Sequence, residues 1–260
     1  MSLLEVNDLS IQFGGLHALE HVTFAVDSGE IVGLIGPNGA GKTTVFNLIT
    51  SIYPPLSGEI KLDGVSLIGR KTHQIFQSGV SRTFQNIRLF KHMSVLDNAR
   101  VAYHHRMKYG VLAGAMRMPR YWREEREATD RALELLDLFN MKPLAEELAS
   151  NLPYGRQREL EIVRALIGKP KLLLLDEPAA GMNPTETHSL MDTICRIRNL
   201  FGVGVLLIEH DMSLVMGICE RIVVLDYGQV IAAGAPREIR SDQRVIGAYL
   251  GVARAAGKAT

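Results

Sequence analysis

The glycine-rich segment at residues 36–43 (GPNGAGKT) constrains the fold of this chain more than any other feature. It follows a short apolar run at residues 31–35, which is typical of a strand buried on both faces. It leads into residues 42–51, where Val45 and Leu48 recur at helical spacing. A strand, a glycine-rich turn and a helix in this order predict an α/β fold. The glycines permit a turn whose backbone N–H groups converge on one point.

The same segment matches the phosphate-binding pattern G-x-x-x-x-G-K-[ST] in full. Converging N–H groups and a helix N-terminus both favour phosphate oxygens. We expect the Lys42 ammonium to meet the β- and γ-phosphates of a nucleoside triphosphate, the Thr43 hydroxyl to bind Mg²⁺, and Thr44 to contact the α-phosphate. The residues assigned to the phosphates are Gly36, Pro37, Asn38, Gly39, Ala40, Gly41, Lys42, Thr43 and Thr44.

A second apolar run ends in two acidic residues. Four leucines at residues 172–175 predict a buried strand, and Asp176 follows at its carboxyl end, where ligands bind in α/β sheets. A carboxylate there can hold Mg²⁺ and its water shell. Glu177 comes next and is placed to polarise a water for attack on the γ-phosphate. We interpret Asp176 as a metal ligand and Glu177 as the catalytic base, the alternative for Glu177 being a solvated loop carboxylate.

Composition excludes several classes of protein. The 260 residues include 29 Lys and Arg against 28 Asp and Glu, and the formal net charge of +1 gives no basic footprint for nucleic acid. Hydrophobic residues make up 47% and charged residues 22%, which excludes a disordered or collagen-like chain. Two cysteines, Cys195 and Cys219, cannot brace a fold of this size, and we expect both to be buried thiols.

The mean hydropathy of +0.07 is high enough to prompt a search for a membrane span. The longest apolar stretches, at residues 172–175 and 203–208, are far shorter than the ~20 residues of a membrane helix. The first residues lack the basic segment and apolar core of a signal peptide. We therefore expect a cytoplasmic chain whose extra apolar residues enter a core or a partner interface.

The rest of the pattern predicts an α/β core interrupted by helices. Two alternating runs separated by Gly14-Gly15 predict an N-terminal antiparallel meander. An amphipathic helix at residues 120–140 opens a helical block, which continues over residues 145–165 apart from a break at Pro153. The strands are expected at residues 3–13, 18–26, 31–35, 58–62, 66–67, 172–175, 203–208, 223–225 and 230–232, and a later helix at residues 185–199.

The segment at residues 103–121 has no clear periodicity. It holds three methionines, three glycine or proline breakers and few acidic residues, so we interpret it as a long loop between helices. A dedicated contact for a partner is the alternative. His104 and His105 are likewise interpreted as loop residues rather than metal ligands, because no cysteine or carboxylate cluster accompanies them.

Further residues in register with these motifs resemble the ATP-binding cassette (ABC) ATPases of membrane transporters. Phe13 lies where that family has an aromatic side chain stacked on adenine, and Gln85 looks like its Q-loop glutamine. His210, after an apolar strand, resembles the switch histidine that contacts the γ-phosphate. Residues 180–183 occupy the place of the D-loop, with Asn instead of the common Asp. The resemblance runs from about residue 3 to residue 250.

The resemblance implies a RecA-like P-loop NTPase core with the N-terminal β meander and an inserted α-helical subdomain. It also implies that two such cassettes sandwich two ATP molecules. The implied single ABC ATPase domain spans residues 1–250, with the core at 1–85 and 166–235, the helical subdomain at about 86–165, a C-terminal helix at about 236–251, and a tail at 252–260.

One motif departs from the family. The usual signature, Leu-Ser-Gly-Gly-Gln, aligns with residues 152–156 (LPYGR). Pro153 replaces the serine whose hydroxyl would reach the γ-phosphate of the opposite subunit, and Tyr154 replaces the first glycine. Gly155 and the start of the following helix can still present backbone donors to that nucleotide.

The Tyr-Gly signature, with residues 86–98, 176–184 and 248–251, resembles the ATPase subunits of branched-chain amino acid importers. This implies ATP hydrolysis that powers uptake of branched-chain or hydrophobic amino acids. The implied partners are a second ATPase subunit, integral membrane permease subunits and, indirectly, a periplasmic or extracellular substrate-binding protein, with this chain peripheral on the cytoplasmic face of the inner membrane. The implied site comprises Glu177, His210 and Gln85 in catalysis, Thr43, Gln85 and Asp176 around Mg²⁺, and Phe13, residues 36–44, Tyr154 and Gly155 around ATP.

Three alternatives stay open. A lipopolysaccharide-export or urea-import ATPase would keep the chemistry and change the cargo, although a more ordinary signature is expected there. A non-transport cassette acting on ribosomes or DNA usually has two cassettes or a coiled-coil insertion, and near-neutral charge argues against nucleic acid. The third is a regulatory nucleotide-binding module in which Pro153 makes hydrolysis negligible, which an ATPase assay distinguishes.

Overall fold

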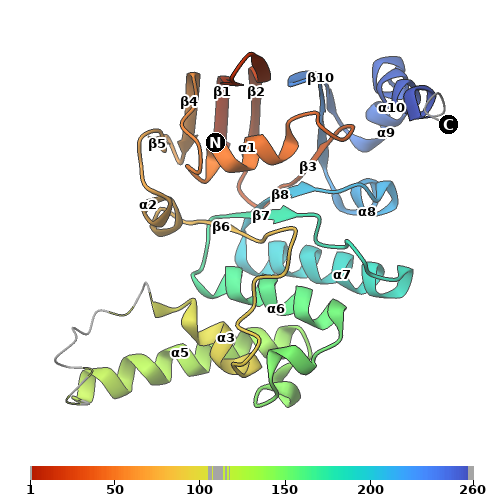
Figure 1. Ribbon diagram of the computed structural model, residues 1–260. Coiled ribbons are helices and arrows are strands. Elements are labelled where there is room, and N and C mark those ends of the chain that lie inside the picture. Colours follow the sequence, from red (N-terminus) through yellow and green to blue (C-terminus); the bar gives the residue numbers. More distant parts are fainter. Residues whose placement is uncertain (1, 105–106, 108–113, 115, 117, 257–260) are drawn as a thin grey trace.

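The structure is a computed structural model that describes residues 2–104, 107, 114, 116 and 118–256, except the side chains of residues 250–256. Two β-sheets lie towards one end of the molecule and a block of helices towards the other (Figure 1). Most of the loop predicted at residues 103–121, including His105, lies outside the described residues, so its two interpretations stay predictions.

The smaller sheet is antiparallel and has the strand order β2-β1-β4-β5. The predicted N-terminal meander is confirmed by this sheet. Its strands are β1 (Ser2–Phe13), β2 (Leu16–Asp27), β4 (Ser57–Leu62) and β5 (Val65–Ser66).

The larger sheet has the order β10-β9-β3-β8-β7-β6 and is parallel except where β10 pairs with β9. Strand β3, which precedes the glycine-rich segment, therefore lies inside the sheet between β8 and β9. The strands are β3 (Ile31–Ile35), β6 (Val80–Arg82), β7 (Leu172–Asp176), β8 (Gly204–Ile208), β9 (Arg221–Asp226) and β10 (Gln229–Gly234).

The helices cover both faces of the larger sheet and form the helical block. They are α1 (Lys42–Ile49), α2 (Thr72–Gln77), α3 (Val95–Val101), α5 (Pro119–Leu138), α6 (Tyr154–Ile167), α7 (Pro184–Phe201), α8 (Met212–Ile218), α9 (Pro236–Ser241) and α10 (Gln243–Ala256), with 3-10 turns η2 (Lys142–Leu144) and η3 (Ala149–Asn151).

The larger sheet is buried on both faces, as its continuous apolar strands predict. Val32 and Leu34 of β3 belong to a core shared with α1 and the smaller sheet. Ile31 and Ile35, which point to the opposite face, belong to a second core with α6, α7, α8 and the helical block. The glycine-rich turn after β3 is thus anchored to a strand packed from both sides.

The predicted helix at 145–165 is wrong in its first half. The backbone there pairs instead with the segment that leads into α3: the Val95 N–H donates to Glu147 O at 2.9 Å, and the Ala149 N–H donates to Met93 O at 3.0 Å. Helix α6 begins only after Pro153, which has an extended backbone at the N-cap position. These hydrogen bonds to a distant segment replace the helical ones that the local pattern favoured.

The C-terminal segment also differs in detail from the single helix expected at residues 236–251. Helices α9 and α10 are separated at Asp242, whose carboxylate accepts the Arg244 N–H at 2.8 Å. Helix α10 continues to Ala256. An Asp side chain that bonds the backbone two residues on competes with helix continuation.

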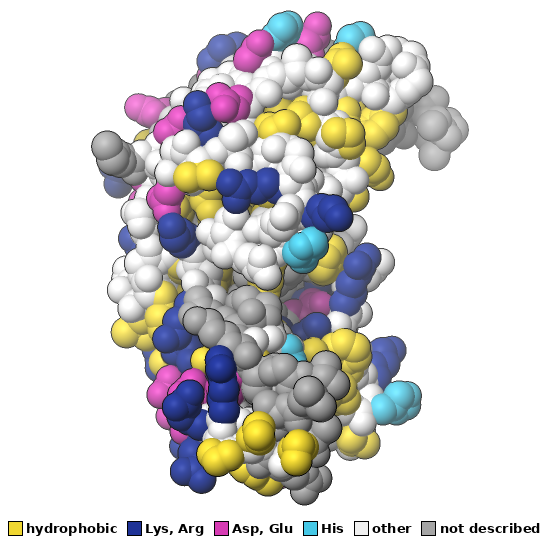
Figure 2. Space-filling view, turned by 90° about the vertical axis from the view of Figure 1, so that its left-hand side faces the viewer, with side chains coloured by type: hydrophobic (Ala, Val, Ile, Leu, Met, Phe, Trp, Pro, Cys, Tyr) yellow, Lys and Arg dark blue, Asp and Glu magenta, His cyan; other side chains and the backbone are white. Residues whose placement is uncertain are grey.

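The two cysteines are free thiols. Cys219 is buried as expected, and burial raises the pKa of its thiol, while Cys195 is only partly buried. On the face shown in Figure 2, Lys and Arg side chains are interspersed with Asp and Glu.

Helix α5 spans 20 residues and buries Ala128, Ala132, Leu135 and Leu136 along one side, so the predicted amphipathic helix at 120–140 is confirmed. Across the described ranges, no helix combines the length and apolar character needed to cross a bilayer.

Candidate active site

The glycine-rich loop joins β3 to α1, and two of its glycines are required by its geometry. Gly36 has φ 151° and Gly41 has φ 103°, a backbone region that residues with side chains rarely adopt. A Cβ atom would lie 2.0 Å from Leu225 O at Gly36, and 2.6 Å from Leu19 Cδ2 at Gly41. The loop therefore presents bare backbone at the N-terminus of α1.

Lys42 places a positive charge inside this loop. Its side chain is buried, and Nζ donates to Gly36 O at 2.7 Å and to Pro37 O at 2.9 Å. Desolvation lowers the pKa of Lys42, although the nearby Glu177 and Asp176 oppose that shift. Thr43, the next residue, is exposed.

The two acidic residues after β7 differ sharply in environment. Asp176 is buried, and its Oδ2 accepts a hydrogen bond from Arg82 at 2.8 Å. Glu177 has a left-handed backbone with φ 49°, and its N–H donates to Ile208 O at 2.9 Å. Such a conformation is uncommon for a residue with a side chain and recurs at functional sites.

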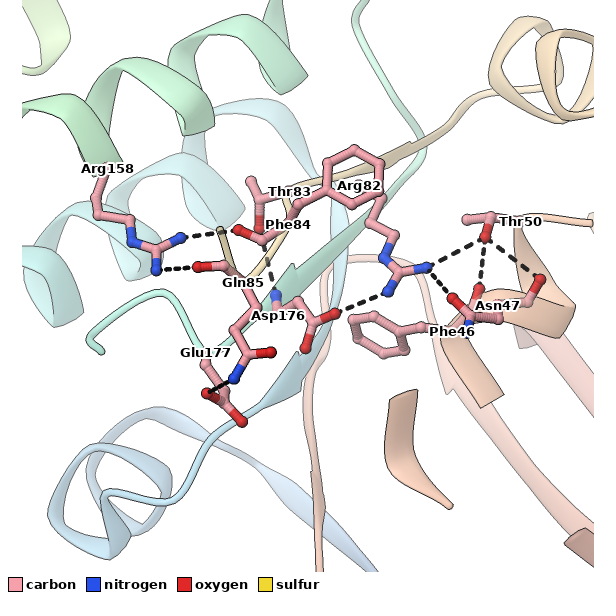
Figure 3. A network of polar contacts seen from close by, with 10 residues as sticks. All are labelled: Phe46, Asn47, Thr50, Arg82, Thr83, Phe84, Gln85, Arg158, Asp176 and Glu177. Carbon is pink, nitrogen blue, oxygen red and sulfur yellow. Dashed lines mark hydrogen bonds and ion pairs between the residues drawn. The ribbon is translucent and has the colours of Figure 1, made fainter. Parts of the chain in front are cut away.

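The three predicted catalytic residues meet at one point. The Gln85 amide Nε2 donates to Glu177 Oε2 at 2.8 Å, and His210 Nε2 lies 2.9 Å from Glu177 Oε1. Figure 3 shows the Gln85 and Glu177 side chains pointing towards each other. They follow β6, β7 and β8, which are neighbours in the sheet, so the carboxyl ends of three adjacent strands supply the cluster.

A cleft of about 630 Å³ lies between this cluster and the glycine-rich loop. Of the predicted residues, Asn38 to Thr44, Gln85, Glu177 and His210 line it, while Gly36, Pro37 and Asp176 are buried beside it. The full lining is Gly15, Leu16, His17, Ala18, Asn38, Gly39, Ala40, Gly41, Lys42, Thr43, Thr44, Gln85, Glu177, His210, Tyr227 and Gly228.

Three further predicted nucleotide contacts, Phe13, Tyr154 and Gly155, are outside that lining. The Phe13 ring packs edge-on against Tyr53, with centroids 5.1 Å apart. Tyr154 and Gly155 begin α6 and contact other parts of this chain, with Gly155 close to the Glu186 carboxylate. Their roles towards a nucleotide stay predictions.

Arg82 was not assigned a role from the sequence, although it lies beside the site. Its guanidinium donates to Asp176 and to Asn47 Oδ1, each at 2.8 Å, and lies 5.3 Å from the ring centres of both Phe46 and Phe84 (Figure 3). Arg82 thereby links β6, β7 and α1. No local pattern in the sequence pairs Arg82 with these partners, because they lie on other elements.

Tyr227 was also missed as part of the site. The sequence predicts strands at residues 223–225 and 230–232 on either side of it and no role in the site, yet Tyr227 lines the cleft. The adjacent Gly228 N–H donates to Ala40 O at 3.1 Å, which joins this hairpin to the glycine-rich loop.

The donors available to a metal are oxygens: the Thr43 hydroxyl, the Gln85 amide oxygen and the Asp176 carboxylate. In the part of the chain that the structure describes, no group of three or more His, Cys, Asp or Glu residues could hold a metal ion. Mg²⁺ fits this arrangement, because it is usually bound by one or two carboxylates together with substrate phosphates and waters. The bare glycine loop and the Lys42 ammonium fit those phosphates.

Comparison with known proteins gives matches over nearly the whole chain. The ABC transporter family model matches residues 19–180, and a model described as branched-chain amino acid ATP-binding cassette transporter matches residues 229–255. The chain is 49% identical to LivG, a high-affinity branched-chain amino acid transport ATP-binding protein of Escherichia coli (strain K12), over 96% of this chain and 98% of LivG. It is 48% identical to BraF of Pseudomonas aeruginosa over the same shares.

A more distant relative is LptB, the lipopolysaccharide export system ATP-binding protein of Escherichia coli (strain K12), at 35% identity over 96% of this chain and 98% of LptB.

Two solved structures share the fold. A nucleotide-free ATP-binding cassette from an ABC transporter has a TM-score of 0.84 at 27% identity, covering 96% of this chain and 99% of that chain. The ADP conformation of MJ1267, an ATP-binding cassette of an ABC transporter, has the same TM-score and coverage at 28% identity. The predicted RecA-like α/β fold with its antiparallel meander is confirmed. The chain belongs to the ABC transporter family, in which it is an ATP-binding cassette.

Proposed function

We propose that this chain hydrolyses ATP to ADP and phosphate and so powers a branched-chain amino acid importer. The observation that carries the hydrolysis is the Glu177 carboxylate, held by Gln85 and His210 at the edge of the cleft that the glycine-rich loop lines. The cargo is supported by the names of LivG and BraF and by the second family model at residues 229–255. LptB, whose name gives another cargo, shares 35% identity against 49% for LivG.

The loop residues bind the triphosphate. The backbone N–H groups of residues 36–44 and the Lys42 ammonium hold the β- and γ-phosphates, Thr44 contacts the α-phosphate, and Phe13 stacks on adenine. Thr43, Gln85 and Asp176 would hold Mg²⁺ with its water shell, and a bound ion would supply positive charge to neutralise the phosphates. Binding in a preorganised site supplies most of the catalysis, because phosphoryl transfer needs little covalent help from the protein.

Glu177 acts on the attacking water. Its carboxylate accepts the proton as the water oxygen bonds to the γ-phosphorus and the bond to the β–γ bridging oxygen breaks. Gln85 and His210 fix the two carboxylate oxygens, 2.8 Å and 2.9 Å from their side-chain nitrogens. His210 also contacts the γ-phosphate, so that one side chain orients both the base and the reacting group.

The site is completed by a second ATPase subunit, whose residues 154 and 155 face the nucleotide through their backbone. Permease subunits in the membrane bind the pair on the cytoplasmic face, and a substrate-binding protein delivers the amino acid to them. Within this chain, residues 1–85 and 166–235 act as the nucleotide-binding core and residues 86–165 as the helical subdomain. Pro153 removes the signature hydroxyl but leaves the backbone donors at Gly155, and these donors support the proposed dimer.

Glu177→Gln tests the hydrolysis. The variant keeps a side chain of the same shape but cannot accept the proton, so we expect unchanged ATP affinity and a loss of turnover of at least ~10²-fold. The measurements are phosphate release and calorimetric ATP binding on the purified chain with Mg²⁺. Glu127→Gln, on the exposed side of α5, is the matched control. Turnover equal to the wild type would remove Glu177 from the role of base.

The cargo is tested separately by uptake. Cells that lack this chain should lose energised uptake of labelled leucine and valine and regain it when the chain is restored, but not when Glu177→Gln is supplied. Unchanged uptake in the deletion would contradict the proposed cargo without affecting the proposed hydrolysis.

A further inference from the structure

Tyr154 is the residue of the signature that departs most in size from the family pattern, and its side chain is directed at its own chain. The hydroxyl accepts a hydrogen bond from the Arg158 guanidinium at 2.9 Å, one turn along α6. The ring covers Gly181, where an added Cβ would lie 3.0 Å from Tyr154 Cε1. The tyrosine therefore has a defined orientation set by two neighbours.

Arg158 uses its other N–H groups on the loop that follows β6. One guanidinium nitrogen donates to Phe84 O at 2.8 Å and the other to Gln85 O (Figure 3). The side chain is only 3% exposed, so these bonds form in a water-poor environment where they hold the backbone firmly. One turn further along α6, the buried Glu161 accepts the Arg88 N–H at 2.6 Å.

Helix α6 thus holds residues 84–88 by their main chain. The Gln85 side chain leaves this held backbone and donates to Glu177 at 2.8 Å. Where the Gln85 amide can reach is set by where its backbone lies. A displacement of about 1 Å in a catalytic group is enough to lower the rate strongly.

Four acceptors surround the Arg158 guanidinium: the carbonyls of Phe84 and Gln85, the Tyr154 hydroxyl, and the buried Glu161 carboxylate at 3.4 Å. The nitrogen that donates to the Tyr154 hydroxyl is the one that also donates to the Gln85 carbonyl, so the hydroxyl helps to fix the donor that holds the Gln85 backbone. We propose that Tyr154 and Arg158 are positioning residues, which together set the backbone of Gln85 so that its amide reaches the Glu177 carboxylate.

This inference rests on the proposed ATP hydrolysis. It assigns the unusual signature residue Tyr154 a role within its own subunit. The Tyr154 side chain acts on its own subunit through Arg158 and Gln85. The backbone of the same residue remains free for the role proposed towards a second subunit.

Tyr154→Phe is the test, because it removes one hydroxyl and keeps the ring on Gly181. We expect kcat to fall by about two- to tenfold, the contribution of one hydrogen bond, with ATP affinity unchanged. In a Gln85→Ala background the same substitution should cost no further activity, since the side chain that it positions is absent. Tyr121→Phe, near the start of α5, is the matched control and should change nothing.

A second measurement needs no turnover. Hydrogen–deuterium exchange of the peptide that covers residues 84–88 should be faster in Tyr154→Phe than in the wild type, and unchanged in Tyr121→Phe. A merely structural effect would lower kcat equally in both Gln85 backgrounds.

Equal losses in the two backgrounds, or unchanged kcat together with unchanged exchange, would overturn the inference. A wild-type chain that shows no ATPase activity would contradict the proposed function instead, while the exchange result would still judge the positioning role.

Discussion

Arg82 offers the sharpest test of how the buried Asp176 carboxylate is held. The Arg82 and Asp176 side chains are 7% and 5% exposed, and they are 2.8 Å apart. Arg82→Met keeps much of the apolar stem but leaves a buried carboxylate without its cation. Breaking a buried ion pair by removing one partner costs about 3–5 kcal/mol. For a chain of this size, that lowers Tm by roughly 6–20 °C.

The assay is thermal and urea unfolding of the purified chain, followed by circular dichroism without nucleotide or divalent ions. The double variant Arg82→Met/Asp176→Asn removes the stranded charge as well, so it should be more stable than Arg82→Met alone. Arg123→Met, which breaks an exposed pair with Glu127 on α5, is the control and should change the unfolding free energy by less than about 1 kcal/mol.

Two results would refute this reasoning. Arg82→Met could unfold within about 1 kcal/mol of the wild type, below the cost of a stranded buried charge. The double variant could also be no more stable than the single one, and the loss would then come from the bond to Asn47 or from contacts with the Phe46 and Phe84 rings.

The remaining predictions concern the nucleotide and the dimer. Lys42→Ala should weaken MgATP binding by roughly 10- to 150-fold, because charge-assisted contacts to phosphate are lost; equal calorimetric affinity would contradict the phosphate assignment. In the Glu177→Gln background, Pro153→Ser should strengthen the ATP-dependent dimer up to about tenfold by restoring a hydroxyl for the facing γ-phosphate. Sedimentation that shows no gain would leave Pro153 as a residue of the helix start alone.

The buried strands and the glycine-rich loop could be predicted from the sequence because local patterns determine them. Residues 31–35 and 172–175 are apolar throughout, and they are buried throughout. Strand β6 could not be found in this way, since Val80–Arg82 is three residues long and includes a serine and an arginine. Its place in the sheet comes from pairing with β7, a contact between segments far apart in the chain.

The residues of the candidate site also differ in whether a local sequence pattern predicts them. Lys42, Asp176 and Glu177 were identified from motifs whose chemistry is local, while Gln85 and His210 came from family resemblance. Arg82 was missed because its partners lie on β7 and α1, and no local pattern pairs them. What the sequence could not give is the set of polar contacts between strand ends, because these depend on strand order.

The signature motif departs from the family pattern at Pro153 and Tyr154, and the effect of these residues cannot be inferred from the lost serine hydroxyl alone. From the sequence, Pro153 removes a hydroxyl and Tyr154 fills the place of a glycine. In the structure, Pro153 has φ −54° and ψ 152°, which suits the position before α6, and its carbonyl accepts the Gln157 N–H at 3.0 Å. The first N–H groups of a helix have no intrahelical acceptors, so those of α6 can still serve a facing phosphate. The Tyr154 hydroxyl is bound to Arg158 instead. We therefore propose two separate roles for the motif: its backbone binds the nucleotide of a second subunit, and the Tyr154 side chain positions Gln85 in its own subunit.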